Sequence, residues 1–153
     1  MFDLASILHV QCTRTNIEAQ SRKGALQTAA DLICENHQEI DARLLLEALL
    51  ERERLGSTGI GEGVAIPHCR MECSGIIAAL FVLASPIDYD SIDGEPVDIL
   101  FTLLVPPEET SAHLDVLAGV SRVFDQADMR TALREATSDA AVHQIMVNAF
   151  NQP

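Results

Sequence analysis

The sequence predicts an α/β fold, a three-layer α/β/α sandwich in which helices cover both faces of a mixed β-sheet. Residues 76–84 (IIAALFVLA) and 97–105 (VDILFTLLV) are almost entirely apolar, as is typical of strands buried on both faces. Helical periodicity precedes and follows them, so the predicted order is strand, two helices, three strands and three helices (β-α-α-β-β-β-α-α-α). Helices on both faces supply the cover that such strands require.

The chain opens with a weak strand signal and a clear helix signal. Residues 5–12 (ASILHVQC) predict a short strand. Residues 21–36 predict an amphipathic helix, because Ser21 can cap its start and apolar residues recur at helical spacing.

A second helix is predicted at residues 41–55 (DARLLLEALLERERL). It starts near Asp41 and ends at Gly56, because glycine accepts the left-handed conformation found just past helix ends. Its apolar stripe continues one turn further, to Arg52. This guanidinium either reaches the rim of the core or points at an anion, and spacing alone does not separate the two.

Three strands follow, at residues 64–69 (VAIPHC) and at the two apolar runs. The Asp93-Gly94 pair between these runs is a turn signal, and the sheet is therefore expected to be mixed. The final helices are predicted at residues 111–125, capped by Thr110 or Ser111, at residues 127–136, and at residues 138–150, capped by Ser138.

Composition excludes several classes of function. The 153 residues carry a formal charge of −13, which repels phosphate backbones and anionic lipid heads. The longest apolar run is far shorter than the roughly 20 residues that span a bilayer. Four cysteines without an export signal are expected to be free thiols. We therefore expect one cytoplasmic domain over residues 1–153, without nucleic-acid binding or membrane insertion.

A loop rich in glycine, residues 56–70 (GSTGIGEGVAIPHCR), leads to the strongest candidate residue, His68. Its ring alternates onto one side of a strand with the apolar residues before it, and Pro67 restricts this strand to an edge or an end. Ligands of open α/β sheets usually bind beyond strand ends. Glu62 could accept a proton from the ring and fix its tautomer, or it could be a solvated loop carboxylate.

His113 is the second candidate. It lies on the apolar stripe of the predicted helix 111–125 and in its first turn, where the helix dipole disfavours imidazolium. It is either a neutral core histidine bonded to a carbonyl or part of a site. His9, His37 and His143 have no neighbouring residues in the sequence that would form a catalytic or ligand site with them, and they are expected to be structural.

Three kinds of chemistry fit these residues poorly. A zinc site of His68, Cys69 and Cys73 lacks a fourth ligand, and adjacent strand residues point to opposite faces. A hydrolase with Ser57 as nucleophile lacks the G-x-S-x-G turn. A phosphate-binding loop for a nucleotide lacks its lysine.

The chemistry that fits these residues best is nucleophilic attack of the neutral His68 imidazole on phosphorus. A phosphoryl group on His68 would add close to two negative charges. Arg52, the amides around Ser57 and Thr58, and the helix end bearing His113 could stabilise it.

The segment LGSTGIGEGVAIPH, residues 55–68, resembles the signature of phosphotransferase-system (PTS) IIA domains of the fructose and mannitol type, with the nitrogen-regulatory IIA-Ntr proteins nearest. The resemblance covers almost the whole chain. It implies that His68 takes phosphate from an HPr-like phosphocarrier (NPr), that His113 lies beside it, that Arg52 stabilises the phosphoryl group, and that Glu62 lines the pocket. Transfer between two histidines implies no metal or other cofactor.

The resemblance leaves three functions to separate. The chain is expected to be a phosphotransferase component that regulates target proteins, such as kinases or transporters. The alternatives are a relay that passes phosphate to a IIB protein and a sugar, and an interaction module that does not use its histidine. The presence of Arg52, His68 and His113 together argues against the last. Cys69 departs from the family pattern, in which glycine usually follows the active histidine.

Overall fold

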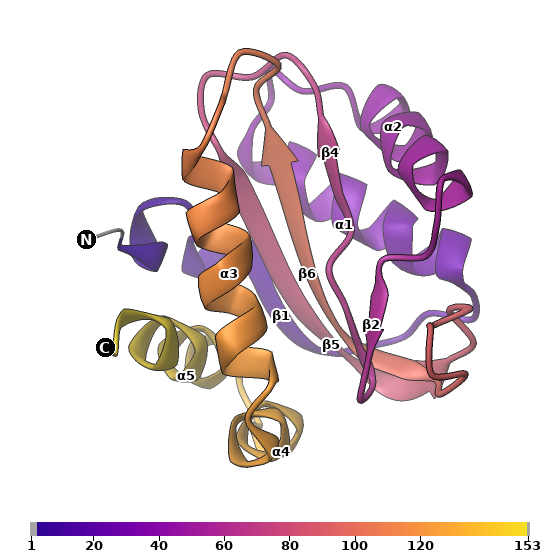
Figure 1. The fold of residues 1–153 in the computed structure, drawn as a ribbon, viewed down its shortest axis with the longest axis vertical. Coiled ribbons are helices and arrows are strands. Elements are labelled where there is room, and N and C mark those ends of the chain that lie inside the picture. Colours follow the sequence, from indigo (N-terminus) through magenta and orange to yellow (C-terminus); the bar gives the residue numbers. More distant parts are fainter. Residues whose placement is uncertain (1–2, 153) are drawn as a thin grey trace.

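The computed structural model describes residues 3–152, and its centre is a mixed six-stranded sheet (Figure 1). Strands run in the order β1-β5-β6-β3-β2, with β4 paired to β6 beyond β3. The β5–β6 and β2–β3 pairs are antiparallel and the others are parallel, so the predicted mixed sheet is confirmed. The strands are β1 (Thr13–Ile17), β2 (Gly59–Gly61), β3 (Val64–Ala65), β4 (His68–Arg70), β5 (Ile77–Ile87) and β6 (Val97–Val105).

Helices cover both faces of the sheet, as predicted. One face packs against α1 (Arg22–Asn36) and α2 (Ala42–Arg54), and the other against α3 (Ala112–Phe124), α4 (Ala127–Glu135) and α5 (Asp139–Asn151) (Figure 1). Alternate residues of β5 enter the two cores: Ala78 and Leu80 face α3–α5, whereas Ala79 and Phe81 face α1 and α2. Across residues 3–152, every helix falls short of the length and apolar character that a membrane span requires.

The strand predicted at residues 5–12 is wrong. This segment forms two short 3-10 helices, η1 (Leu4–Ser6) and η2 (Val10–Cys12), and the first strand follows at Thr13–Ile17. Local hydrogen bonds replace strand pairing here: the Ile7 and Leu8 amides donate to the Leu4 carbonyl, and the Cys12 amide donates to the His9 carbonyl. The burial of Leu4, Leu8 and Cys12 fits a strand face as well as a helical turn, so the apolar pattern alone could not separate the two.

Three of the predicted helix caps are present. Ser21 accepts from the Gly24 amide at 3.0 Å, Asp41 from the amides of α2, and Ser138 from the Ala141 amide at 3.1 Å. Ser111 is the N-cap residue of α3, one of the two predicted, but its side chain makes no capping bond: Glu109 Oε1 accepts instead from the amides of Ser111 (3.0 Å) and Ala112 (2.6 Å).

The glycine loop is more ordered than its composition suggests. It forms the β2–β3 hairpin, and the predicted strand 64–69 is interrupted at Pro67 into β3 and β4. Pro67 has no N–H, but its carbonyl accepts from Leu103 N at 2.9 Å, so the chain keeps its register with β6. β4 is an edge strand, as the proline predicts.

The last helix joins the two ends of the described chain (Figure 1). Asn151 accepts from the Leu4 amide (3.3 Å), Asp139 accepts from the Thr15 amide (2.9 Å), and His143 Nε2 lies 2.8 Å from the Leu8 carbonyl. The N-terminal segment is therefore held in part by α5, and β1 is held by its pairing with β5 together with the bond to Asp139.

Candidate functional site

His68 is the first residue of β4, and its ring is half-buried. Its Nδ1 lies 2.7 Å from the Ile66 carbonyl oxygen. A carbonyl can only accept, so Nδ1 carries the ring proton. In the neutral ring Nε2 therefore holds the lone pair, and it is the nitrogen that can act as a nucleophile.

The surroundings of His68 favour this neutral ring. Burial lowers the pKa of His68 below its usual 6.5, and the positive charge of Arg52 and an electrostatic contribution from His113 lower it further. The hydrogen bond to Ile66 and the negative charge of Glu53 act in the opposite direction without reversing the shift. Arg52 and His113 therefore lie within electrostatic reach of the ring.

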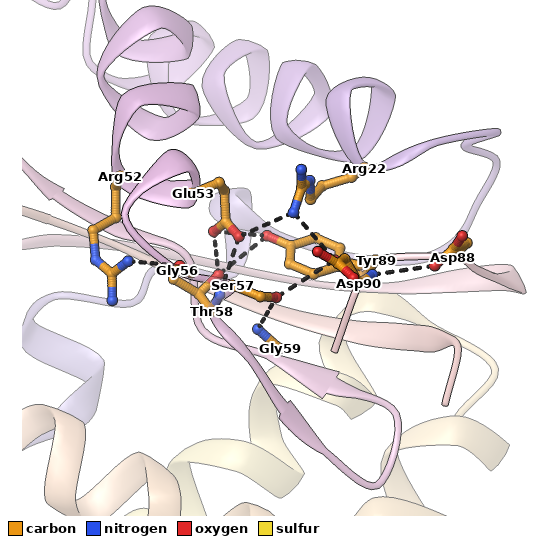
Figure 2. Close-up of polar contacts among 10 residues, drawn as sticks. All are labelled: Arg22, Arg52, Glu53, Gly56, Ser57, Thr58, Gly59, Asp88, Tyr89 and Asp90. Atoms are coloured by element: carbon orange, nitrogen blue, oxygen red, sulfur yellow. Dashed lines mark hydrogen bonds and ion pairs between the residues drawn. The ribbon is translucent and has the colours of Figure 1, made fainter. Parts of the chain in front are cut away.

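Arg52 stands in the last turn of α2, and Gly56 follows this helix with φ of +150°, a region open to glycine. Arg52 Nη1 donates to the Gly56 carbonyl at 2.8 Å (Figure 2). Within residues 3–152 this carbonyl is its one hydrogen-bond partner. The bond holds the guanidinium at the start of the glycine loop and leaves its other N–H groups for an incoming anion.

His113 lies in the first turn of α3, and its ring bonds to a cation, not to the carbonyl that one of the two alternatives required. Its Nε2 lies 3.4 Å from Nη2 of Arg70, which also donates through Nη1 to the carbonyls of Pro106, Pro107 and Glu109. A guanidinium can only donate, so Nε2 accepts and Nδ1 carries the proton of the neutral ring. Nδ1 is buried and has no hydrogen-bond partner among the described residues.

The N-terminus of α3 is not the open anion site that was predicted. Its amides at Ser111 and Ala112 already donate to the Glu109 carboxylate. These bonds lower the pKa of Glu109, so a negative charge occupies this helix end. Any contribution of α3 to holding a phosphoryl group therefore comes from His113 rather than from these amides.

The Thr58 amide and the hydroxyls of both Ser57 and Thr58 already have hydrogen-bond partners. The Thr58 amide donates to Glu53 Oε1 at 3.0 Å, and its hydroxyl donates to Oε2 of the same carboxylate. The Ser57 hydroxyl lies 3.4 Å from the Tyr89 carbonyl and accepts from the Gly59 amide at 3.1 Å (Figure 2). The predicted role of the Thr58 amide is wrong, because a neighbouring carboxylate already takes it.

Glu62 does not accompany His68, and the Ile66 carbonyl, not Glu62, fixes the His68 tautomer. Glu62 is exposed in the β2–β3 turn, at the end of the sheet opposite β4 (Figure 1). Its carboxylate lies 3.6 Å from Arg130, and its carbonyl accepts from Arg134 at 2.7 Å. The hairpin carries this residue away from the histidine that follows it in sequence.

Cys69 faces away from His68, as the strand geometry predicts. It packs on the core beneath α1 and α2, whereas Leu103, the register partner of His68, belongs to the opposite core. Burial raises the pKa of the Cys69 thiol to about 12. In residues 3–152 we find no group of three or more His, Cys, Asp or Glu side chains that could hold a metal ion.

The sequence analysis missed one buried residue of the site, Glu53. Its carboxylate accepts from Thr58 and, at 3.2 Å, from the Tyr89 hydroxyl, and it forms an ion pair with Arg22 at 3.9 Å (Figure 2). A signal was present. Leu45, Leu49 and Glu53 recur every four residues on the buried face of α2, whereas the sequence analysis had continued this stripe to Arg52.

Comparisons with known proteins agree with this fold. A family model described as "Phosphoenolpyruvate-dependent sugar phosphotransferase system, EIIA 2" matches residues 6–149. A nitrogen regulatory protein of Pseudomonas aeruginosa is 42% identical over 152 residues, 99% of each chain. One of Escherichia coli is 40% identical, over 98% of this chain and 93% of its own.

Solved structures show the same similarity. The crystal structure of nitrogen regulatory protein IIA-Ntr from Neisseria meningitidis matches with a TM-score of 0.88 and 34% identity, over 94% of this chain and 98% of that one. IIA mannitol from Escherichia coli matches with a TM-score of 0.71 and 16% identity, over 88% of this chain and 95% of that one, a likeness of fold alone.

Proposed function

The chain belongs to the EIIA 2 family of the phosphoenolpyruvate-dependent sugar phosphotransferase system, and we propose that it is a regulatory phosphocarrier of the IIA-Ntr kind, phosphorylated on His68 Nε2. Family membership makes it a phosphotransferase-type component. Its similarity to nitrogen regulatory proteins over nearly its whole length favours the regulatory branch. The observation that carries the proposal is the bond from Nδ1 to the Ile66 carbonyl, which leaves Nε2 unprotonated.

The phosphoryl donor is a phosphohistidine on an HPr-like phosphocarrier (NPr). The lone pair on His68 Nε2 attacks phosphorus, a new N–P bond forms, and the N–P bond of the donor breaks with its electron pair returning to the donor imidazole. The positive charge that develops on the His68 ring is shared with Nδ1–H, whose bond to the Ile66 carbonyl strengthens as a result.

Two side chains stabilise the transferred group. A phosphoryl group carries close to two negative charges and three acceptor oxygens. The unbonded N–H groups of Arg52 supply donors to this group, and Arg52 and His113 both interact electrostatically with His68. No metal is required, because transfer between two imidazoles uses an already activated phosphoryl group.

Regulation follows from the added charge. Phosphorylation changes the charge at one surface position by nearly two units, and this favours or prevents the docking of a target protein there. The whole chain, residues 1–153, acts as the switching unit. Sugar uptake that persists in a deletion strain supports a regulator, and its loss would indicate a relay.

Labelling tests the phosphorylation directly. The protein is incubated with phosphoenolpyruvate, enzyme I and the phosphocarrier, and the experiment is repeated with His68→Ala and with His37→Ala as the control. We expect acid-labile phosphate on the wild type and on the control, and none on His68→Ala. Acid-stable phosphate, or equal labelling of His68→Ala, would overturn the mechanism.

A further inference from the structure

Glu53 is a buried carboxylate between two exposed charged neighbours. It is only 5% exposed, whereas Glu51 and Arg54 on the same helix form an exposed ion pair. Burying a carboxylate costs free energy unless its oxygens are satisfied. Both oxygens of Glu53 are satisfied, and two of the three donors belong to Thr58.

Thr58, in the glycine loop, is hydrogen-bonded to Ile66, the residue whose carbonyl accepts from His68. Its carbonyl accepts from the Ile66 amide at 3.0 Å, and the Ile66 carbonyl in turn accepts from His68 Nδ1 at 2.7 Å. Three hydrogen bonds therefore lead from the Glu53 carboxylate through Thr58 and Ile66 to the ring.

The loop needs such an anchor because its own backbone is permissive. Gly56 precedes Thr58, and Gly59, Gly61 and Gly63 follow it, so the local chain can adopt many conformations. Glu53 fixes Thr58 from the end of α2, and Tyr89 fixes the carboxylate from the loop after β5 (Figure 2). A helix and a loop from distant parts of the chain thus set the position of one carbonyl.

We propose that Glu53 is a positioning residue for phosphoryl transfer: by holding Thr58, it keeps the Ile66 carbonyl where it bonds His68 Nδ1 and directs the lone pair to Nε2. The proposal rests on the proposed function. It predicts that the length of the side chain at position 53 matters more for the His68 tautomer and for labelling than its negative charge does.

Two conservative variants separate reach from charge. Glu53→Asp keeps the charge but withdraws the carboxylate by one methylene from Thr58. Glu53→Gln keeps the length: its carbonyl oxygen can accept from the Thr58 amide, and its NH₂ group can donate to the two hydroxyls. Glu51→Asp and Glu51→Gln make the same changes at an exposed position of the same helix.

The first readout is the tautomer of His68 in the unphosphorylated protein, from long-range ¹⁵N–¹H correlations of the ring at pH 7.5, well below the thermal midpoint of each variant. We expect a single Nδ1–H tautomer in the wild type, in Glu53→Gln and in both Glu51 variants, and a mixture in Glu53→Asp. The second readout is the rate of labelling by the phosphocarrier, which should fall about 10- to 100-fold in Glu53→Asp alone, as expected when a bond to a charged group is lost.

Several outcomes would overturn the proposal. One is an unchanged tautomer in Glu53→Asp, even if its thermal midpoint falls, because a merely structural role would lower stability alone. Another is a larger loss in Glu53→Gln than in Glu53→Asp, which would assign the effect to charge. Absence of labelling in the wild type would instead overturn the proposed function, and the tautomer measurement would still decide on Glu53.

Discussion

Replacing Gly119 by alanine sets two opposing effects against each other in α3, the helix that carries His113. Glycine in a helix interior is less favourable than alanine by about 1 kcal/mol, so propensity alone predicts a gain in stability. A Cβ at this position, however, would lie 2.8 Å from Cζ and 3.0 Å from Cδ2 of the Phe150 ring in α5, and closer still to Cε2. Phe150 is only 8% exposed, so the ring has little room to withdraw.

The sizes of these two effects decide whether the substitution lowers or raises stability. Overpacking a core contact costs about 1–3 kcal/mol, which exceeds the propensity gain and leaves a net loss of about 1 kcal/mol. For a chain of this size, the thermal midpoint of Gly119→Ala should fall by about 2–4 °C. Thermal and urea unfolding followed by circular dichroism measure this difference.

The same substitution should reverse sign in a Phe150→Leu background. Leucine lacks the ring atoms that the new Cβ would meet, so only the helix propensity remains and Gly119→Ala should then stabilise the protein. The four proteins form a double-mutant cycle. A midpoint that rises for Gly119→Ala in the wild-type background would refute the reasoning, because it would show that the Phe150 ring moves at little cost.

Three further predictions concern the site. The pH at which labelling is half-maximal should lie below 6.5, because burial lowers the pKa of His68 and the neutral ring is the nucleophile; a half-maximal rate above pH 6.5 would contradict this. Arg52→Ala should slow labelling about tenfold or more while His37→Ala leaves it unchanged, since only the first removes a donor to the phosphoryl group, and equal rates would remove Arg52 from the site. Alkylation of Cys69 at pH 8, followed by mass spectrometry, should be far slower in the folded than in the urea-unfolded chain, because a pKa of about 12 leaves roughly one thiol in ten thousand ionised; similar rates would count against that burial.

The strongly patterned parts of the fold could be predicted from the sequence, and the weakly patterned parts could not. The two apolar runs became β5 and β6, buried on both faces, because covered strands have little freedom of composition. β1 reads TRTNI, with Thr13 as its one buried residue, and a short polar strand at the sheet edge carries no periodic signal. The first strand was therefore predicted in the neighbouring apolar segment, residues 5–12.

The site residues also fall into a group that could be predicted from the sequence and a group that could not. His68, Arg52 and His113 were identified because each breaks an apolar pattern, and the structure places Arg52 and His113 each within electrostatic reach of His68. Contacts made by main-chain atoms leave no trace in residue types, and this explains why the Ile66 carbonyl was missed. Of the two alternatives for Glu62, the structure shows the exposed loop carboxylate. Glu53 was missed because its neighbours in ERER look like a solvated helix end.

The bonds from α5 to the N-terminal segment make the folding of this segment depend on distant parts of the chain. Thr13 pairs with Leu80 of β5, and the turns before it bond to Asn151 and His143 of α5. Neither the turns nor β1 can therefore reach their final state from local interactions alone, and such non-local pairing slows folding. Loss of residues 139–151 would remove the side chains that hold the N-terminal turns in place.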